Sequence, residues 1–377
     1  MAAENCTERQ QDQGRGIIIG GSGLIGGALV HHFKTRVENT EILAPNSKRL
    51  SLNKPADIQL YFRQYRPNFI INAAIAAINS DAQLAYETNY LGALNLAEVA
   101  IEHNIPYIHI SSAATMPMGT NLSEEDRLPL RPNLPNYSKS KLMAELTLEH
   151  LARTRGLDFT TVRLSIVYGK HDHKIQGFHR LLYSIADQAM PILLTRKKAM
   201  HSYSNARKIS PFVHHLLNNR KEFSGQAYNF ADPEPVDLSH LILTIKALLD
   251  LKTPRKVYLP LPIARTGKNM ISWFIGKLNR IGIEARMPGE LMFLESFYKS
   301  QTLSTKKLLQ SSYQDPQPEA TIYSELPALI EYYLTRWEHL NLITTFNTEF
   351  YSPKNNLDDF KTDPAKLLAA VHKQNNR

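Results

Sequence analysis

The sequence predicts an α/β fold built on a doubly wound parallel sheet, with a smaller C-terminal lobe. Strand-like apolar runs alternate with stretches of helical period through the first half of the chain. This alternation is typical of parallel strands joined by helices that cover both faces of the sheet. The first strand-like run ends in a cluster of glycines, where a strand should pass into a helix. After residue 169 the pattern loosens, which indicates a second, less regular part.

Each expected element follows from its local pattern. Short apolar runs bounded by polar or turn residues indicate strands, and longer stretches with apolar residues at helical spacing indicate helices. The expected strands are residues 16–19, 41–44, 68–74, 107–110, 159–169 and 226–232. The expected helices are residues 23–36, 55–65, 81–103, 136–154, 177–188 and 269–282, with a last helical stretch near 364–372.

Composition limits the class of protein. A chain of 377 residues with 43% hydrophobic residues can bury a full core. Its longest uncharged apolar run, residues 69–78, is far shorter than the ~20 residues that a membrane helix needs. The polar first residues do not resemble a secretory signal. Because Cys6 is the only cysteine, no disulfide can form within the chain, and we expect a cytoplasmic protein.

Charge and potential metal ligands give weaker indications. The net charge of +9 suits either an anionic ligand such as a nucleotide or a generally basic surface. The basic residues are scattered rather than clustered, so no nucleic-acid partner is expected. The His-Asp-His segment at residues 171–173 has no supporting Cys or His ligands, and we interpret it as a solvated loop. No metal site is expected.

The glycines after the first strand predict a phosphate-binding turn. Gly20, Gly23 and Gly26 are spaced for a tight bend that lets a pyrophosphate approach the main chain and lets the helix pack closely. The N-terminus of the following helix offers free N–H groups and the positive end of its dipole to the phosphates. We therefore expect a dinucleotide-binding, Rossmann-type domain, with a simple packing motif as the alternative.

The segment after the second strand indicates which dinucleotide binds. An acidic residue about 20 positions after the glycines normally holds the ribose 2′-hydroxyl of NAD. Residues 42–56 contain no carboxylate, and Asn46, Ser47, Lys48 and Arg49 occur there instead. Basic and hydroxyl groups suit a 2′-phosphate, so NADP is the expected cofactor. NAD remains the alternative if this segment is only a solvated turn.

A tyrosine, a lysine and a serine form the candidate catalytic set. Tyr137 precedes Lys141 by four residues, which places both on one face of the expected helix. Ser112 ends the strand that begins at residue 107, at the carboxyl edge where open α/β sheets bind ligands. A Tyr-x-x-x-Lys spacing arises easily by chance, so the interpretation as a catalytic set depends also on the position of Ser112. A surface tyrosine with flanking lysines is the alternative.

In combination, these motifs resemble the extended short-chain dehydrogenases/reductases of the nucleotide-sugar epimerase/dehydratase type. The resemblance covers roughly residues 15–337, and the motifs occur in the order and at the spacing typical of that family. The segments that carry it are GGSGLIG (20–26), NAA (72–74), NYLGALNLAEVA (89–100), ISSAAT (110–115), YSKSK (137–141) and VRLSIVYG (162–169). It implies an NAD(P)-dependent oxidoreductase or epimerase that transfers a hydride on a nucleotide-activated sugar.

The resemblance also implies residue roles. Tyr137 would be the acid/base, and Lys141 would favour its phenolate and hold the nicotinamide ribose, because a free phenol titrates near ~10. Ser112 would hydrogen-bond the reacting oxygen. Asn89 would support the water network near Lys141, unless it is only a helix-interior polar residue. The implied cofactor contacts are Gly20, Gly21, Ser22, Gly23, Leu24, Ile25, Gly26, Asn46, Lys48, Ala73, Ala74, Asn89, Ser111, Tyr137, Lys141 and Val167.

The expected domain organisation follows from the same pattern. Residues 1–14 would be a flexible arm and residues 338–377 an appended tail. The Rossmann domain would comprise residues 15–169, with elements returning to it at about 202–250. The substrate-binding lobe would comprise residues 170–201 and 251–337.

The residues after Ser112 depart from the family pattern. Family dehydratases carry an acid pair directly after this position, because β-elimination needs an extra acid and base. Here Ala113 and Ala114 follow, so dehydration is not expected and reduction or epimerisation remains. Met116 and Met118 are expected to form an apolar wall near the hydride centre.

The substrate half departs as well. His201 aligns with an arginine that touches the sugar-nucleotide phosphates in many members, and Lys208 replaces a helix-capping aspartate. Arg196, Lys197 and Lys198 are the expected alternative contacts for an anionic diphosphate.

Two other functions stay open. A hydroxysteroid-like or other lipid alcohol dehydrogenase is favoured by the methionines and by an amphipathic stripe formed by Met270, Ile271, Phe274, Ile275 and Leu278. Such a stripe more often forms core or a pocket wall than a lipid contact, so peripheral membrane binding is the lesser expectation. A non-catalytic dinucleotide-binding sensor or scaffold is the third reading, and the complete Tyr-Lys-Ser set argues against it. A homodimer is left open.

Overall fold

The computed structural model describes residues 14–187, 192–193, 198–280, 293–340, 342, 361 and 365. The chain divides into two compact units, Met1–Leu329 and Ile330–Arg377. The expected α/β class with a parallel sheet is confirmed. Several sequence-based expectations fall outside the described residues: most of the N-terminal arm with Cys6, the cations Arg196 and Lys197, and nearly all of the C-terminal tail.

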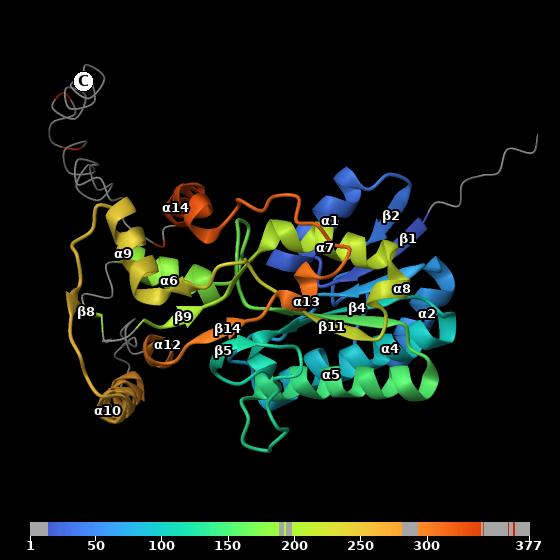
Figure 1. Cartoon of the computed structure of the whole chain (residues 1–377), viewed down its shortest axis with the longest axis horizontal. Helices are drawn as coiled ribbons and strands as arrows, with labels where there is room; N and C mark the ends of the chain where they lie inside the picture. Colours follow the sequence, from blue (N-terminus) through green and yellow to red (C-terminus); the bar gives the residue numbers. More distant parts are fainter. Residues whose placement is uncertain are drawn as a thin grey trace, which may run out of the picture. The chain divides into compact units, whose positions relative to one another are not determined.

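Six parallel strands form the central sheet, in the order β11-β6-β4-β3-β1-β2 (Figure 1). They are β1 (Gly14–Ile19), β2 (Thr40–Leu43), β3 (Phe69–Asn72), β4 (Tyr107–Ser112), β6 (Phe159–Leu164) and β11 (Gln226–Phe230). After β1 the chain moves to β2 on one side and then returns to β3 on the other side of β1. Ligands bind at the carboxyl ends of the strands at such a reversal of direction.

Helices cover both faces of this sheet, and each face has its own core (Figure 1). One face carries α1 (Leu24–Arg36) and α7 (Ala206–Asn218), and the other carries α2 (Pro55–Tyr65), α4 (Gly92–His103) and α5 (Asn136–Arg155). Phe33 and Phe212 pack against the sheet on the first face, and Phe62 and Leu148 pack on the second. Burial on both faces explains why the strands are almost continuously apolar.

The expected helix at residues 81–103 is interrupted. It consists of α3 (Ala82–Ala85), a π-helical segment (Tyr86–Leu91) and α4. Asp81 caps its start by accepting a hydrogen bond from the Leu84 main-chain nitrogen at 2.8 Å. The π-helical segment contains Asn89, which is 1% exposed. Such segments often occur at functional sites.

The expected strand at residues 159–169 is two strands. β6 stays in the large sheet, whereas β7 (Ile166–Tyr168) leaves it and pairs with β10 (Tyr203–Asn205). The break falls at Ser165, whose main-chain nitrogen donates to Ser204 Oγ at 3.0 Å. The apolar run at residues 159–169 is therefore continuous in sequence but is divided in the structure, because its two halves pair with strands of different sheets.

A smaller sheet lies after the carboxyl edge of β4. Its strands, in order, are β12 (Val236–Asp237), β9 (Met200–His201), β14 (Gln301–Leu303) and β5 (Gly119–Leu122). The side chain of Gln301 donates to the carbonyl oxygens of Ala113 and Pro117, both at 3.1 Å. The smaller sheet therefore supports the turn that follows Ser112.

The other strands and α-helices of the described residues are β8 (Ile192–Leu193), β13 (Arg255–Lys256), α6 (Gly177–Ala186), α8 (Arg220–Phe223), α9 (Leu238–Leu248), α10 (Leu261–Arg280), α12 (Leu294–Tyr298), α13 (Lys306–Leu309) and α14 (Ile322–His339).

The expectation that the amphipathic stripe forms core is wrong. The stripe lies on α10, and only Ala264 of that helix is buried. Met270 and Phe274 are 67% and 57% exposed, and the contacts described between α10 and α12 lie in the first turns of α10. Within the described part of the chain, no helix is both long and apolar enough to cross a membrane.

Candidate active site

The turn between β1 and α1 has no room for a side chain at two of its glycines. Gly20 has a φ of +83°, and a Cβ there would lie 2.6 Å from the Ala73 carbonyl oxygen. A Cβ on Gly26 would lie 2.1 Å from the Gly20 carbonyl oxygen, so only glycine lets α1 pack on the end of β1. A Cβ on Gly23 would meet only that same oxygen, at 3.4 Å. Gly20 and Gly26 therefore serve the fold, whereas Gly23 keeps main chain accessible.

The first turn of α1 is suited to an anion. Gly23 is the N-cap residue, and no side-chain hydrogen bond caps the helix. The first turn of α1, which is described over residues 24–36, contains no acidic residue. The N–H groups that begin a helix lack intrahelical partners, and the helix dipole is positive there. Unpartnered N–H groups of this kind are suited to a phosphate or diphosphate.

Two neighbouring segments reach the same edge of the sheet. The Ala73 nitrogen donates to the Ile19 carbonyl at 2.9 Å, which holds the chain after β3 against the glycine turn. The Asn46 side chain accepts from the main-chain nitrogens of Lys48 and Arg49, both at 3.1 Å. The Asn46 amide oxygen is thus used to shape the turn after β2. Lys48 is exposed on that turn as a cationic group.

Tyr137, Lys141 and Ser112 come together at the carboxyl edge of β4. Tyr137 and Lys141 lie one turn apart on α5 and are 7% and 2% exposed. Lys141 Nζ donates to the Ile110 carbonyl in β4 at 2.9 Å, and the Ser112 side chain lies near enough to the Tyr137 hydroxyl to lower its pKa. Their proximity is the one that the sequence pattern predicts.

Burial perturbs both titratable members of this set. Burial raises the pKa of Tyr137, and the hydrogen bond with Ser112 lowers it in part. Burial lowers the pKa of Lys141 to about 8, and the negative charge of Glu145 acts in the opposite direction. A buried lysine that titrates near neutral pH beside a buried tyrosine is typical of a catalytic site.

Beneath the set lies a buried ion pair that the sequence analysis missed. The side chains of Glu145 and Arg163 are each 1% exposed, and the Glu145 carboxylate accepts from Arg163 Nε at 2.9 Å and Nη2 at 2.8 Å. It also accepts from the hydroxyls of Ser111 and, at 3.2 Å, Thr115. Glu145 follows Lys141 by four residues, as Lys141 follows Tyr137, and that spacing could have identified it.

Comparison with known proteins agrees with this geometry. A sequence model of the NAD dependent epimerase/dehydratase family matches residues 17–231. The chain belongs to this family. It is 22% identical over 224 residues to the GDP-L-colitose synthase of Yersinia pseudotuberculosis, covering 54% of this chain and 72% of that protein.

Solved structures share the fold. The UDP-glucose 4-epimerase of Thermus thermophilus, a complex with NAD, has a TM-score of 0.60 and 18% identity, covering 85% of this chain and 98% of that chain. The dTDP-4-dehydrorhamnose reductase of Bacillus anthracis str. Ames, a complex with NADP, has a TM-score of 0.59 and 17% identity, covering 85% of this chain and 99% of that chain. As a family member, the chain is an enzyme that uses a nicotinamide dinucleotide.

The side chains of two predicted cofactor contacts, Ser111 and Asn89, have hydrogen-bond partners within the protein. The Ser111 hydroxyl, expected to contact the cofactor, is turned into the interior and donates to Glu145. Asn89 holds two elements together: its Oδ1 accepts from the Ala76 nitrogen at 2.9 Å, and its Nδ2 donates to Ser140 Oγ at 3.0 Å. Asn89 thus links the loop after β3 to α5. Val167 lies in β7 and is half-buried.

The methionine wall expected beside the hydride centre is wrong. Met116 is 3% exposed and packs in a small core with Leu122 and Leu303, whereas Met118 is 53% exposed. His201 is also occupied: its Nε2 is hydrogen-bonded to the Ser296 carbonyl at 2.8 Å. Among the described residues, no group of three or more His, Cys, Asp or Glu side chains is arranged for a metal ion.

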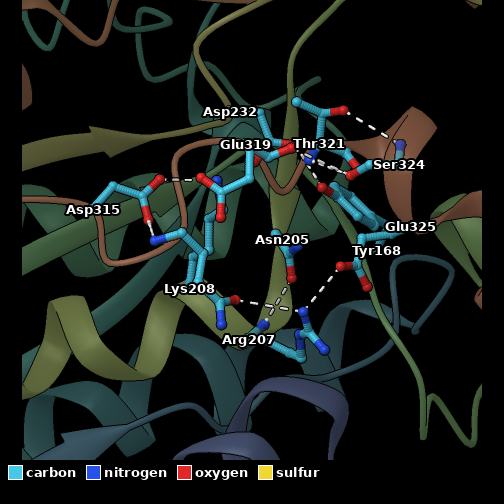
Figure 2. Close-up of polar contacts among 11 residues, drawn as sticks. Tyr168, Asn205, Arg207, Lys208, Asp232, Asp315, Glu319, Thr321, Ser324 and Glu325 are labelled. Carbon is cyan, nitrogen blue, oxygen red and sulfur yellow. Dashed lines mark hydrogen bonds and ion pairs between the residues drawn. The ribbon is translucent and has the colours of Figure 1, made fainter.

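The unusual Lys208 has acidic partners supplied from far along the chain. Lys208 is 3% exposed, and its Nζ lies 2.8 Å from Asp315 Oδ2. Its neighbour Arg207 pairs with Glu325 at 2.9 Å, and Asn205 caps α7 in the position before them (Figure 2). Lys208 therefore does not occupy the capping position expected from the sequence, because Asn205 caps the helix. Arg207 and Lys208 instead hold the segment that leads into α14.

The same cluster contains a buried acid. The Tyr168 hydroxyl donates to Asp232 Oδ2 at 2.7 Å (Figure 2). Burial raises the pKa of Asp232 to about 6, and the Tyr168 hydrogen bond and the Lys208 charge oppose that shift. Asp232 follows β11, whose carboxyl end it extends.

Proposed function

We propose that this enzyme transfers a hydride at a carbinol or carbonyl carbon of a nucleotide-activated sugar, as a reductase or an epimerase, with NADP as its cofactor. The observation that carries the proposal is the burial of Tyr137 and Lys141 on one face of α5, with the Ser112 side chain near enough to lower the pKa of Tyr137. A protein that only bound a dinucleotide would have no need for Tyr137, Lys141 and Ser112 all together at one edge of the sheet.

The chain's own residues handle the proton and the reacting oxygen. When bound, the nicotinamide dinucleotide supplies or accepts the hydride. In reduction, the Tyr137 hydroxyl donates its proton to the substrate oxygen as negative charge develops there, and in oxidation the phenolate takes that proton back. The Ser112 hydroxyl donates a hydrogen bond to the same oxygen. The Lys141 ammonium stabilises the phenolate form of Tyr137.

The residues next to Ser112 favour reduction or epimerisation over dehydration. β-Elimination requires a further acid and base beside the tyrosine, and Ala113 and Ala114 supply neither. Support for the substrate class comes from the relatives, which are named for reactions of GDP-, dTDP- and UDP-linked sugars. Support for NADP comes from Lys48 and Arg49 in the turn after β2.

Turnover by the wild-type enzyme and by Tyr137→Phe tests the proposal. We expect UDP-, GDP- or dTDP-sugars to raise the thermal midpoint of both proteins, whereas sterols do not. Turnover, followed by nicotinamide absorbance, should fall by about 10²- to 10⁴-fold in Tyr137→Phe, with dinucleotide affinity retained. Equal turnover would remove Tyr137 from the mechanism. A shift with sterols alone would favour a lipid alcohol dehydrogenase, and dinucleotide binding without any turnover would favour a sensor or scaffold.

A further inference from the structure

α10 combines positive charge and exposed apolar surface. Its 20 residues include Arg265, Lys268, Lys277 and Arg280 and contain no carboxylate. Figure 1 shows the helix beside α12 and apart from the six-stranded sheet. Nothing in the proposed catalysis uses this helix.

The apolar residues of α10 face solvent. Ile263, Met270, Trp273 and Phe274 are 58%, 67%, 62% and 57% exposed. The residues Asn269, Met270, Ile271, Trp273 and Phe274 line a shallow hollow on the helix. Proteins seldom expose several neighbouring large apolar side chains to water unless that surface binds a partner.

The helix is anchored through its first turns and exposed in its middle. Ala264 is buried against Leu294, and Arg265 pairs with Glu295 of α12 at 2.6 Å. Beyond this anchor, every residue from Asn269 to Phe274 is exposed. The anchor therefore holds the helix while the stretch from Asn269 to Phe274 remains available for contact.

The charge and the side-chain types select the partner. A helix with four cations and no carboxylate, on a chain of net charge +9, attracts an anionic surface and repels a second copy of itself. Lys277 Nζ lies 3.9 Å from the centre of the Trp273 ring, so a cation and an amphipathic aromatic ring lie side by side on the helix surface. Tryptophan and basic residues favour that arrangement at the headgroup boundary of a bilayer.

We propose that α10 is an interfacial helix that docks the enzyme reversibly on an anionic lipid surface. Trp273, Phe274 and Met270 enter the headgroup boundary, and the basic residues contact lipid phosphates and carboxylates. This inference goes beyond the proposed function, because docking does not depend on the reaction that the enzyme catalyses.

Sedimentation with lipid vesicles tests the proposal on the full chain. We expect the protein to sediment with phosphatidylcholine vesicles that contain phosphatidylserine, far less with phosphatidylcholine alone, and less as salt is raised. Lys268→Glu/Lys277→Glu should weaken partitioning by at least about 25-fold, since each cation contributes roughly fivefold. Trp273→Ser/Phe274→Ser should weaken it by at least about tenfold.

Matched variants separate α10 from the rest of the surface. Leu60→Ser/Leu309→Ser removes two apolar side chains that are 68% and 72% exposed elsewhere. Lys34→Glu/Lys221→Glu makes the same charge change on exposed lysines of other helices. Both should bind vesicles nearly as well as the wild type, and thermal unfolding would verify that all variants are folded.

Three results would overturn the proposal. The first is a wild-type protein that stays in solution with anionic vesicles. The second is a Trp273→Ser/Phe274→Ser variant that binds as tightly as the wild type. The third is a self-associated wild type that this variant converts to monomers, with no vesicle binding by either, because the surface would then join copies of the chain.

Discussion

The Glu145 carboxylate and the Arg163 guanidinium form a buried ion pair, with Nη2 and Oε2 2.8 Å apart, one helical turn beyond Lys141. The pair links α5 to β6, so it fixes the helix that carries the candidate catalytic residues against the sheet. It also places a negative charge where it raises the pKa of Lys141 against the effect of burial. Glu145 is therefore a positioning residue in our interpretation of the site.

Breaking this pair should be costly. Glu145→Ala leaves the Arg163 guanidinium buried without its carboxylate, and we expect the free energy of unfolding to fall by about 3–5 kcal/mol. The matched control is Glu149→Ala on the same helix, which removes the partly exposed pair with Arg127 and should cost no more than about 1 kcal/mol. Urea unfolding measures both. Similar losses for the two variants would contradict a special role for the buried pair.

A milder change should alter the pH profile. Glu145→Gln removes the negative charge that raises the pKa of Lys141, so that pKa should fall further below its value of about 8. If catalysis needs the Lys141 ammonium, the alkaline limb of kcat/KM should move down by about one pH unit. A purely structural role would instead lower kcat/KM equally at every pH. Glu149→Gln should leave the profile in place.

The glycines of the turn should separate into two classes. A Cβ at Gly26 would lie 2.1 Å from a main-chain oxygen, so Gly26→Ala should fail to fold or unfold at a much lower temperature. Gly23 has room for a Cβ, so Gly23→Ala should fold with a nearly unchanged thermal midpoint. Calorimetric titration should nevertheless show dinucleotide affinity reduced by about tenfold or more, because the methyl group stands at the phosphate-binding helix start. Full affinity in Gly23→Ala would place the diphosphate elsewhere.

Asp232 should make stability depend on pH. Its pKa in the folded protein is about 6 and its ordinary value is 3.8, so the folded state binds the proton more tightly than the unfolded state. The stability from this group is therefore full below pH 3.8 and is lost as the pH rises through about 6. We expect Asp232→Asn to be more stable than the wild type by about 1–3 kcal/mol at pH 8 and similar near pH 4. Thermal unfolding across that range measures the difference, and a constant gain at all pH values would contradict this origin.

The cofactor preference depends on the turn after β2. We expect tighter binding of NADP(H) than NAD(H), and Lys48→Ala/Arg49→Ala should weaken NADP(H) by about tenfold or more with little effect on NAD(H). Parallel fluorescence titrations of the four nucleotides would measure this. Tighter NAD(H) binding by the wild type would refute the assignment.

Local sequence patterns were sufficient for the sheet, the glycine turn and the candidate catalytic set. The isoleucine runs, the spacing of Gly20, Gly23 and Gly26, and the four-residue step from Tyr137 to Lys141 express constraints that act within a few residues. Such constraints can be interpreted without knowing what packs against them. They also placed Ser112 at the carboxyl edge of the sheet, where open α/β folds bind ligands.

Only the tertiary structure decided which side chains those patterns turn inward or outward. Met116 became core and the stripe on α10 became surface, although both are equally apolar in sequence, because burial depends on which distant element packs there. Lys208 found Asp315 across more than 100 positions, and Glu145 found Arg163 on another strand. Pairings between distant residues leave no periodic pattern in the sequence. The sequence by itself therefore determined the sheet, its helices and the candidate residues at its carboxyl edge. Only the tertiary structure decided the polar contacts around that edge and which apolar residues stay exposed.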